Sequence, residues 1–339
     1  MNVFRSAAGA TTRLRGVRHA VALAAAALAT VGLSACTGGS PEPAATDAPA
    51  PVTSSAPVGN TAAPTALTGT RFYLGTTDQE AVIHAVRGDV DRVTARIPLG
   101  AGDCVRNTIT ISPYGERLAW VEGGAGKDAG ALVTSMVDGS GRRTIERNLP
   151  FGATVSCLGS NALVWSRNDH LMVQQGREHP VLVDVADGKP VNGDPGSETL
   201  KWWSVDGRSQ AAVSEGRTYA SGASGVHFYR YTPPKAEAAH HDGWRVRSVS
   251  MDGRYVAVGW MNTDPSRNDG SFAVVDTTTS TVVDLPGEGD IRSILFTADE
   301  KVIVRRAGGI TVLDKSFRPA GTIEEPAPVR DLTLLAYAA

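Results

Sequence analysis

Basic residues recur at one place in this chain, the start of a short apolar stretch that leads into a turn. At four of these places an arginine follows valine or isoleucine, and at a fifth a lysine precedes two tryptophans. If these stretches are strands that line a central channel, their guanidinium and ammonium groups would gather at one mouth of it and bind a carboxylate or phosphate group. The candidate ligand-binding residues are Arg106, Lys201, Arg247, Arg292 and Arg330.

A structural role is the alternative for the same arginines. Asp103 lies three residues before Arg106, and Asp290 lies two residues before Arg292. Ion pairs between neighbouring structural repeats would use up these positive charges. The sequence leaves both interpretations open.

Two cysteines occupy matching places in successive repeats. Cys104 and Cys157 each begin a stretch that we interpret as the innermost strand of a repeat. In an exported protein these residues meet an oxidising environment, so we predict a Cys104–Cys157 disulfide. The alternative is two separate buried thiols, because an offset of one residue could direct the side chains apart.

The third cysteine follows an export signal. Arginines precede an apolar run at residues 20–33, which is too short to cross a hydrocarbon core that needs roughly 20 helical residues. The run ends in Leu33-Ser34-Ala35-Cys36, which resembles the bacterial lipobox. The resemblance implies a lipoprotein signal peptide at 1–35 and a lipidated Cys36. The alternative is an ordinary secretory signal with a chance cysteine.

Residues 36–68 contain the lipidated cysteine and a segment rich in proline, alanine and threonine. Six prolines prevent a helix, and almost no large apolar side chain is available for a core. We predict a disordered linker that holds the remaining chain away from the membrane. The protein is therefore expected at the extracytoplasmic face of the cell membrane, attached by lipid.

Beyond residue 68 a turn pattern recurs between short apolar stretches. A serine or threonine starts each turn, often followed by Asp-Gly, which suits a tight turn because short polar side chains bond nearby backbone and glycine tolerates positive φ. Spacings of 38 to 54 residues match a four-stranded propeller blade. The anchoring hydroxyls are Ser112, Ser166, Ser204, Ser250 and Thr297.

The two ends of the repeat region supply a sixth blade. Segments 71–75, 81–86 and 92–97 predict three strands without an innermost partner, and 329–337 predicts a strand without a blade. Pairing them closes the ring and removes exposed sheet edges. We predict an all-β, six-bladed β-propeller over residues 69–339, closed by the C-terminal strand, with a shortened blade after Ser166. A β-sandwich is the alternative.

The repeat has a family resemblance. Trp203 to Val213, Ser250 to Val258 and Ser112 to Trp120 resemble the repeats of TolB-type, WD-repeat-like propellers. The signal and the linker resemble those of actinobacterial lipoproteins. This resemblance implies a binding scaffold rather than an enzyme.

Charge and motifs narrow the functional classes. Removing the four arginines of the signal from the net charge of −2 leaves −6, so we expect no nucleic-acid partner. We find no catalytic motif and expect no cofactor or metal. Our hypothesis is a monomeric, membrane-anchored module that binds an envelope protein or a small anionic ligand. The alternative is a propeller hydrolase or lyase that acts on carbohydrate or peptide at the channel mouth.

Overall fold

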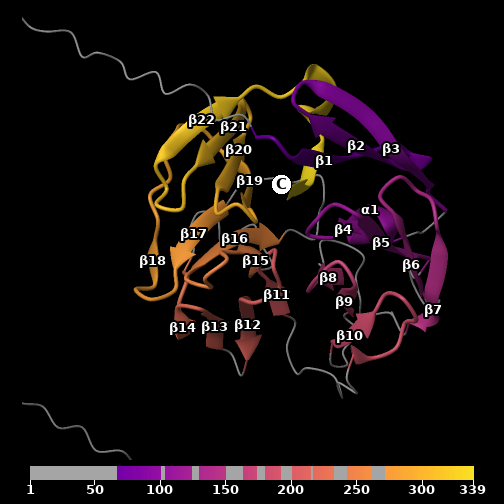
Figure 1. The fold of residues 1–339 in the computed structure, drawn as a ribbon, viewed down its shortest axis with the longest axis horizontal. Helices are drawn as coiled ribbons and strands as arrows, with labels where there is room; N and C mark the ends of the chain where they lie inside the picture. Colours follow the sequence, from indigo (N-terminus) through magenta and orange to yellow (C-terminus); the bar gives the residue numbers. More distant parts are fainter. Residues whose placement is uncertain are drawn as a thin grey trace, which may run out of the picture. The chain divides into compact units, whose positions relative to one another are not determined.

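The computed structural model is an all-β propeller of six blades arranged in a ring (Figure 1). This confirms the predicted fold class. No helix in the part of the chain that the structure describes is long and apolar enough to cross a membrane. The described residues are 67–100, 104–123, 130–149, 163–173, 180–191, 201–214, 217–232, 243–261 and 272–339.

Each blade is an antiparallel sheet, and we number the blades along the chain. Blade 1 has the order β23-β1-β2-β3, and in every other blade the strands follow chain order from the innermost strand outward. Blade 1 contains β1 (Thr70–Thr76), β2 (Glu80–Arg87), β3 (Val90–Pro98) and β23 (Thr333–Ala338). Blade 2 contains β4 (Thr110–Ile111), β5 (Arg117–Glu122), β6 (Gly130–Met136) and β7 (Arg143–Leu149), and blade 3 contains β8 (Leu163–Trp165), β9 (His170–Val173) and β10 (Val181–Asp184).

The second half of the ring has three four-stranded blades. Blade 4 contains β11 (Lys201–Trp203), β12 (Gln210–Ser214), β13 (Arg217–Gly222) and β14 (Gly225–Tyr229). Blade 5 contains β15 (Gly243–Val249), β16 (Tyr255–Met261), β17 (Phe272–Asp276) and β18 (Thr281–Val282). Blade 6 contains β19 (Ile291–Phe296), β20 (Val302–Arg306), β21 (Gly309–Leu313) and β22 (Pro319–Ile323). Blade 3 has three strands within its described residues, in line with the shortened blade that we predicted.

The hydrophobic core lies between neighbouring blades. Ile83 of blade 1 packs in one cluster with Trp120 and Val133 of blade 2. Val274 of blade 5 shares another cluster with Val304 of blade 6. Because neighbouring blades cover both faces of a middle strand, its sequence is a continuous run of apolar residues and does not alternate between apolar and polar residues.

The recurring turn has the chemistry that its residues predict. The Ser250 hydroxyl accepts the N–H of Tyr255 at 2.9 Å and donates to the Asp252 carboxylate at 2.7 Å. Gly253 has a φ of +76°, which a side chain would strain. The hydroxyls of Ser112, Ser204 and Thr297 likewise accept backbone N–H groups four or five residues further on.

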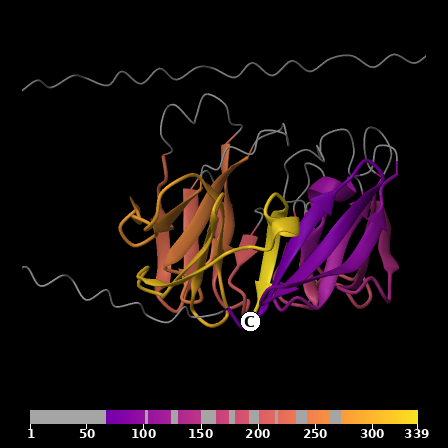
Figure 2. The ribbon, with the colours of Figure 1, turned by 90° about the horizontal axis from the view of Figure 1, so that it is seen from above.

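The C-terminal strand closes the ring as predicted. β23 pairs antiparallel with β1 as the innermost strand of blade 1, and the carboxyl end of the chain lies at one face of the ring (Figure 2). Leu334 and Tyr337 of β23 are buried, and the Tyr337 hydroxyl accepts the N–H of Gly69 at 3.1 Å. The two ends of the described chain are therefore joined by backbone and side-chain contacts.

A buried ion pair fastens this closure. Arg305 of β20 and Glu325 lie 2.9 Å apart, and their side chains are only 3% and 1% exposed. The Tyr73 hydroxyl of β1 donates to the same carboxylate at 2.6 Å. Burial, followed by the hydrogen bond to Glu325, raises the pKa of Tyr73 well above its usual value. Blade 6, the closing segment and blade 1 thus meet at one carboxylate.

Two predicted strand boundaries were wrong. The stretch from Cys104 to Ile111, expected as an innermost strand, forms the short helix α1 (Val105–Thr108) before the two-residue strand β4. The Thr108 hydroxyl donates to the Cys104 carbonyl and accepts the N–H of Val121, both at 2.9 Å, so a side chain takes the place of a strand ladder.

The last strand also begins later than expected. A 3-10 turn, η2 (Ala327–Val329), occupies its predicted start, and β23 begins at Thr333. The carbonyls of Val329 and Arg330 accept hydrogen bonds from Arg305 instead of pairing in a sheet.

Candidate functional site

The five predicted cations define what we call the arginine end of the propeller. Lys201 is the first residue of β11 and Arg292 is the second residue of β19, while Arg106 and Arg330 come shortly before β4 and β23. Arg247 lies within β15. The inner strands of blades 4, 5, 6 and 1 contact one another in succession, so these positions lie on neighbouring inner segments of the ring.

The structure brings Arg292 and Arg330 together. Arg292 Nη1 donates to the Arg330 carbonyl at 3.0 Å, and Arg330 Nε donates to the Glu325 carbonyl at 2.8 Å. Arg330 also pairs with Glu324. On the neighbouring blade, Arg106 Nη2 donates to the Thr77 carbonyl at 2.6 Å. Carbonyl acceptors orient a guanidinium group but leave its net charge in place.

Carboxylates of adjacent chain segments lie near two of these arginines. Arg292 is 3.8 Å from Asp331, and Arg106 is 3.9 Å from Asp78. Both carboxylates are almost fully exposed, which weakens such pairs by solvent screening. Arg292 of blade 6 thus pairs with Asp331, which precedes the closing strand of the adjacent blade 1. Asp103 lies outside the described residues. The ion-pair interpretation holds in part, and the anion site stays a prediction.

Arg247 and its neighbour Arg245 add half-buried positive charge on β15. Burial, followed by the positive charge of Arg245, lowers the pKa of Arg247 to about 10. The Arg247 guanidinium also lies over the ring of Phe272, 5.9 Å from its centre. We did not identify Arg245 from the sequence, although its spacing of two residues from Arg247 on a strand was a usable signal.

The predicted cysteine chemistry falls mostly outside the described residues. Cys104 is buried and packs against Leu163 and Trp165 of blade 3. Cys157 and Cys36 lie outside the described part of the chain. The disulfide and the lipidation therefore stay predictions.

A second candidate site was missed by sequence reasoning. A cavity of about 510 Å³, which we call the turn-end pocket, lies where the recurring turns of blades 2, 3 and 4 meet. These turns follow the inner strands, so the pocket lies at the opposite end of those strands from the arginine end. Its lining consists of Tyr114, Glu116, Arg117, Arg167, Asn168, Asp169, Asp206 and Arg208.

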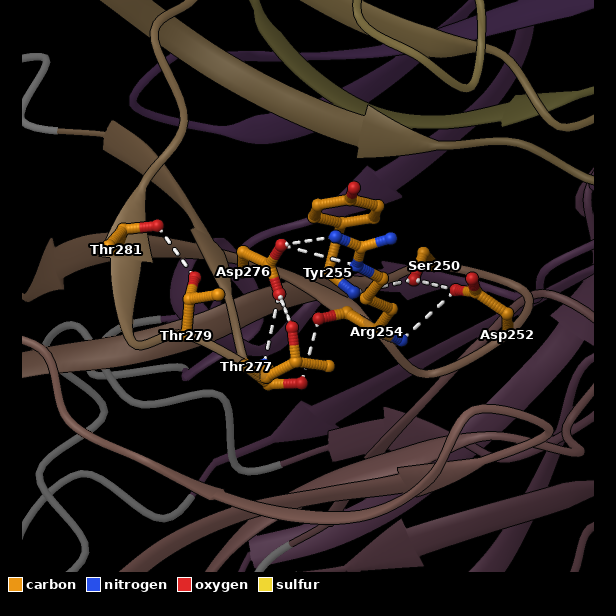
Figure 3. A network of polar contacts seen from close by, with 9 residues as sticks. Ser250, Asp252, Arg254, Tyr255, Asp276, Thr277, Thr279 and Thr281 are labelled. Carbon is orange, nitrogen blue, oxygen red and sulfur yellow. Dashed lines mark hydrogen bonds and ion pairs between the residues drawn. The ribbon is translucent and has the colours of Figure 1, made fainter.

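The corresponding turn of blade 5 shows what a fully paired arrangement looks like. Arg254 donates to Asp276 from Nε at 3.2 Å and from Nη2 at 2.7 Å, and its guanidinium stacks on Tyr255 (Figure 3). Thr278 also donates to Asp276. Burial alone would raise the pKa of Asp276, but the hydrogen bonds from Arg254 and Thr278 outweigh it and hold the pKa below its ordinary value.

Metal-binding groups are not gathered in the described residues. No three His, Cys, Asp or Glu side chains in those ranges lie together as metal ligands do.

Comparison with known proteins gives relatives at the level of fold. No protein-family model and no curated protein sequence matches the chain. Among solved structures it is similar to TolB from Acinetobacter baumannii, with 13% identity over 75% of this chain and 68% of that chain and a TM-score of 0.37. It is also similar to the propeller domain of the Trilobed protease from Pyrococcus furiosus, with 10% identity, coverage of 76% and 93%, and a TM-score of 0.38. Prolyl oligopeptidase B from Galerina marginata is similar over 75% of this chain and 44% of that chain, with 11% identity and a TM-score of 0.40. We draw nothing about function from similarities this distant.

Proposed function

We propose that this protein is a lipid-anchored binding module at the extracytoplasmic face of the cell membrane. Its propeller binds a protein partner or a small ligand through an anionic group at the arginine end. Cys36, at the end of an export signal, would carry the lipid, and the linker would hold the propeller away from the bilayer. A Cys104–Cys157 disulfide would suit the oxidising compartment.

The arrangement of Arg106, Arg292 and Arg330 carries this proposal. Each donates to a backbone carbonyl, which orients its guanidinium group. The carboxylates beside them, Asp78, Asp331 and Glu324, are exposed to solvent, which weakens their hold on the three charges. All three side chains remain partly exposed, at 44%, 33% and 47%. A carboxylate or phosphate can therefore reach groups that are already oriented, and charge-assisted hydrogen bonds to oriented guanidinium groups are the strong ones.

Titration of the full mature chain with inorganic phosphate tests the chemistry of this site. We expect measurable binding by calorimetry, weakened by about tenfold or more in an Arg292→Gln/Arg330→Gln variant, because each charge-assisted hydrogen bond contributes about 1.5–3 kcal/mol. Arg230→Gln, an exposed arginine of blade 4, is the matched control and should bind as the native chain does.

Thermal unfolding of the same variants separates binding from stability. A double variant that loses stability but keeps its phosphate affinity would contradict the proposal and favour a purely structural role for these arginines.

A further inference from the structure

We propose that the turn-end pocket is a second binding site, for a short peptide segment that carries a negative and a positive group close together. This site is independent of the anion site proposed above. The turns that line it follow β4, β8 and β11, whereas the cations of the arginine end, apart from Arg247, precede or begin their inner strands.

The pocket has balanced charge. Three guanidinium groups and three carboxylates line it, together with an amide and a tyrosine. A ligand with charge of one sign would gain from half of these groups and be repelled by the other half. A segment with both signs can match both sets. The cavity volume of about 510 Å³ is within the range of about 300–1,000 Å³ that is usual for small-ligand sites.

Some of the lining groups are committed to the protein. Asp206 accepts the Ser204 hydroxyl at 2.6 Å and the N–H of Arg208 at 3.1 Å. Asn168 accepts the N–H of Tyr114 at 3.1 Å, which ties the turns of blades 2 and 3 together. These contacts build the wall of the pocket.

Other lining groups are available. Within the described ranges, Glu116, Arg117 and Arg167 have no side-chain hydrogen bond or ion pair. Asp169 approaches only the ring of His170, at 3.8 Å. Two guanidinium groups and two carboxylates therefore line the pocket from two adjacent turns.

Comparison between blades explains why Arg208, the third guanidinium group of the lining, has no close carboxylate on the third strand of its blade. In blade 5 the third strand, β17, ends in Asp276, which holds Arg254. The third strands of blades 2 and 4 end in Met136 and Gly222, which have no charge. Arg208 occupies the place of Arg254 in its turn. Its side chain is 84% exposed, and the carboxylate that it approaches, Asp206, is 3.7 Å away.

The walls of the pocket are held rigidly. A Cβ on Gly115 would lie 2.5 Å from the ring of Phe72, and a Cβ on Gly207 would lie 2.5 Å from the Ser166 carbonyl oxygen. The two turns are thus packed directly on neighbouring blades. A ligand meets a preformed site, which reduces the entropy cost of binding. Tyr114, which is 47% exposed at the rim, offers an aromatic surface to the peptide backbone or to an apolar side chain.

Four end-blocked tetrapeptides test the inference on the full mature chain by calorimetry. One contains a lysine and a glutamate, one contains only the lysine, one only the glutamate, and one neither charge. We expect the doubly charged peptide to bind about tenfold more tightly than either singly charged peptide. Arg167→Gln and Glu116→Gln should each remove this preference, and Arg230→Gln should preserve it.

Three results would overturn the inference. They are no binding of the doubly charged peptide, equal binding of the glutamate-only peptide, and a preference that survives both pocket substitutions. Phosphate titration of Arg167→Gln distinguishes this site from the arginine end, because phosphate affinity there should stay at the native value. All of the substituted side chains are on the surface, so thermal unfolding should show that the variants remain folded.

Discussion

Replacing Glu325 by alanine should lower the free energy of unfolding by about 3–5 kcal/mol, the usual cost of removing one partner of a buried ion pair. The Arg305 guanidinium, only 3% exposed, would lose its carboxylate and remain buried. The Tyr73 hydroxyl would lose its acceptor at the same time. Because this carboxylate joins blade 6 to blade 1, the effect should appear as a lower midpoint in chemical denaturation.

The adjacent residue provides the matched control. Glu324 pairs with Arg330, but both side chains are exposed, at 79% and 47%. Exposed pairs contribute about 0–1 kcal/mol, so Glu324→Ala should change the midpoint little. Equal effects of the two substitutions would show that the buried pair does not fasten the ring.

Gly207→Ala should destabilise the protein by about 3 kcal/mol, since it combines a strained backbone with a steric clash. Gly207 has a φ of +70°, and its added Cβ would lie 2.5 Å from the Ser166 carbonyl oxygen. A backbone atom of the neighbouring blade cannot move aside as a flexible side chain can. Denaturant unfolding measures this loss directly.

Gly88 separates the two contributions. It has a similar φ of +60°, with nothing within 4 Å of an added Cβ. Gly88→Ala should therefore cost only the conformational part, about 1 kcal/mol. If Gly207→Ala cost no more than this control, the turns of blades 3 and 4 would not be packed as described.

Local chemistry made the blades and the turns predictable from the sequence. Ser204 and Ser250 bond backbone only a few residues away, so the turn has a short local pattern that could be recognised by its recurrence along the chain. Ring closure followed from counting strands, because β1 lacked an innermost partner and the last segment lacked a blade. The stretch that became α1 was misassigned because the Thr108 hydroxyl, and not an apolar pattern, decides its conformation.

The less predictable features depend on contacts between distant residues. Tyr73 and Glu325 are 252 residues apart, and nothing near either one indicates the other. The exposure of Arg208 in the turn-end pocket depends on which residue ends the third strand of its blade. Asp276 in blade 5 and Gly222 in blade 4 differ in this respect, and the comparison requires the strand register.

Crosslinking in intact cells tests the central claim, that the arginine end binds an anionic partner outside the cytoplasm. A photoreactive amino acid in place of Asp331, which lies 3.8 Å from Arg292 and is almost fully exposed, would report what approaches this end. We predict one reproducible adduct, identified by mass spectrometry, that disappears in the Arg292→Gln/Arg330→Gln background. Adducts with lipid alone, or an adduct formed equally in that background, would contradict the claim.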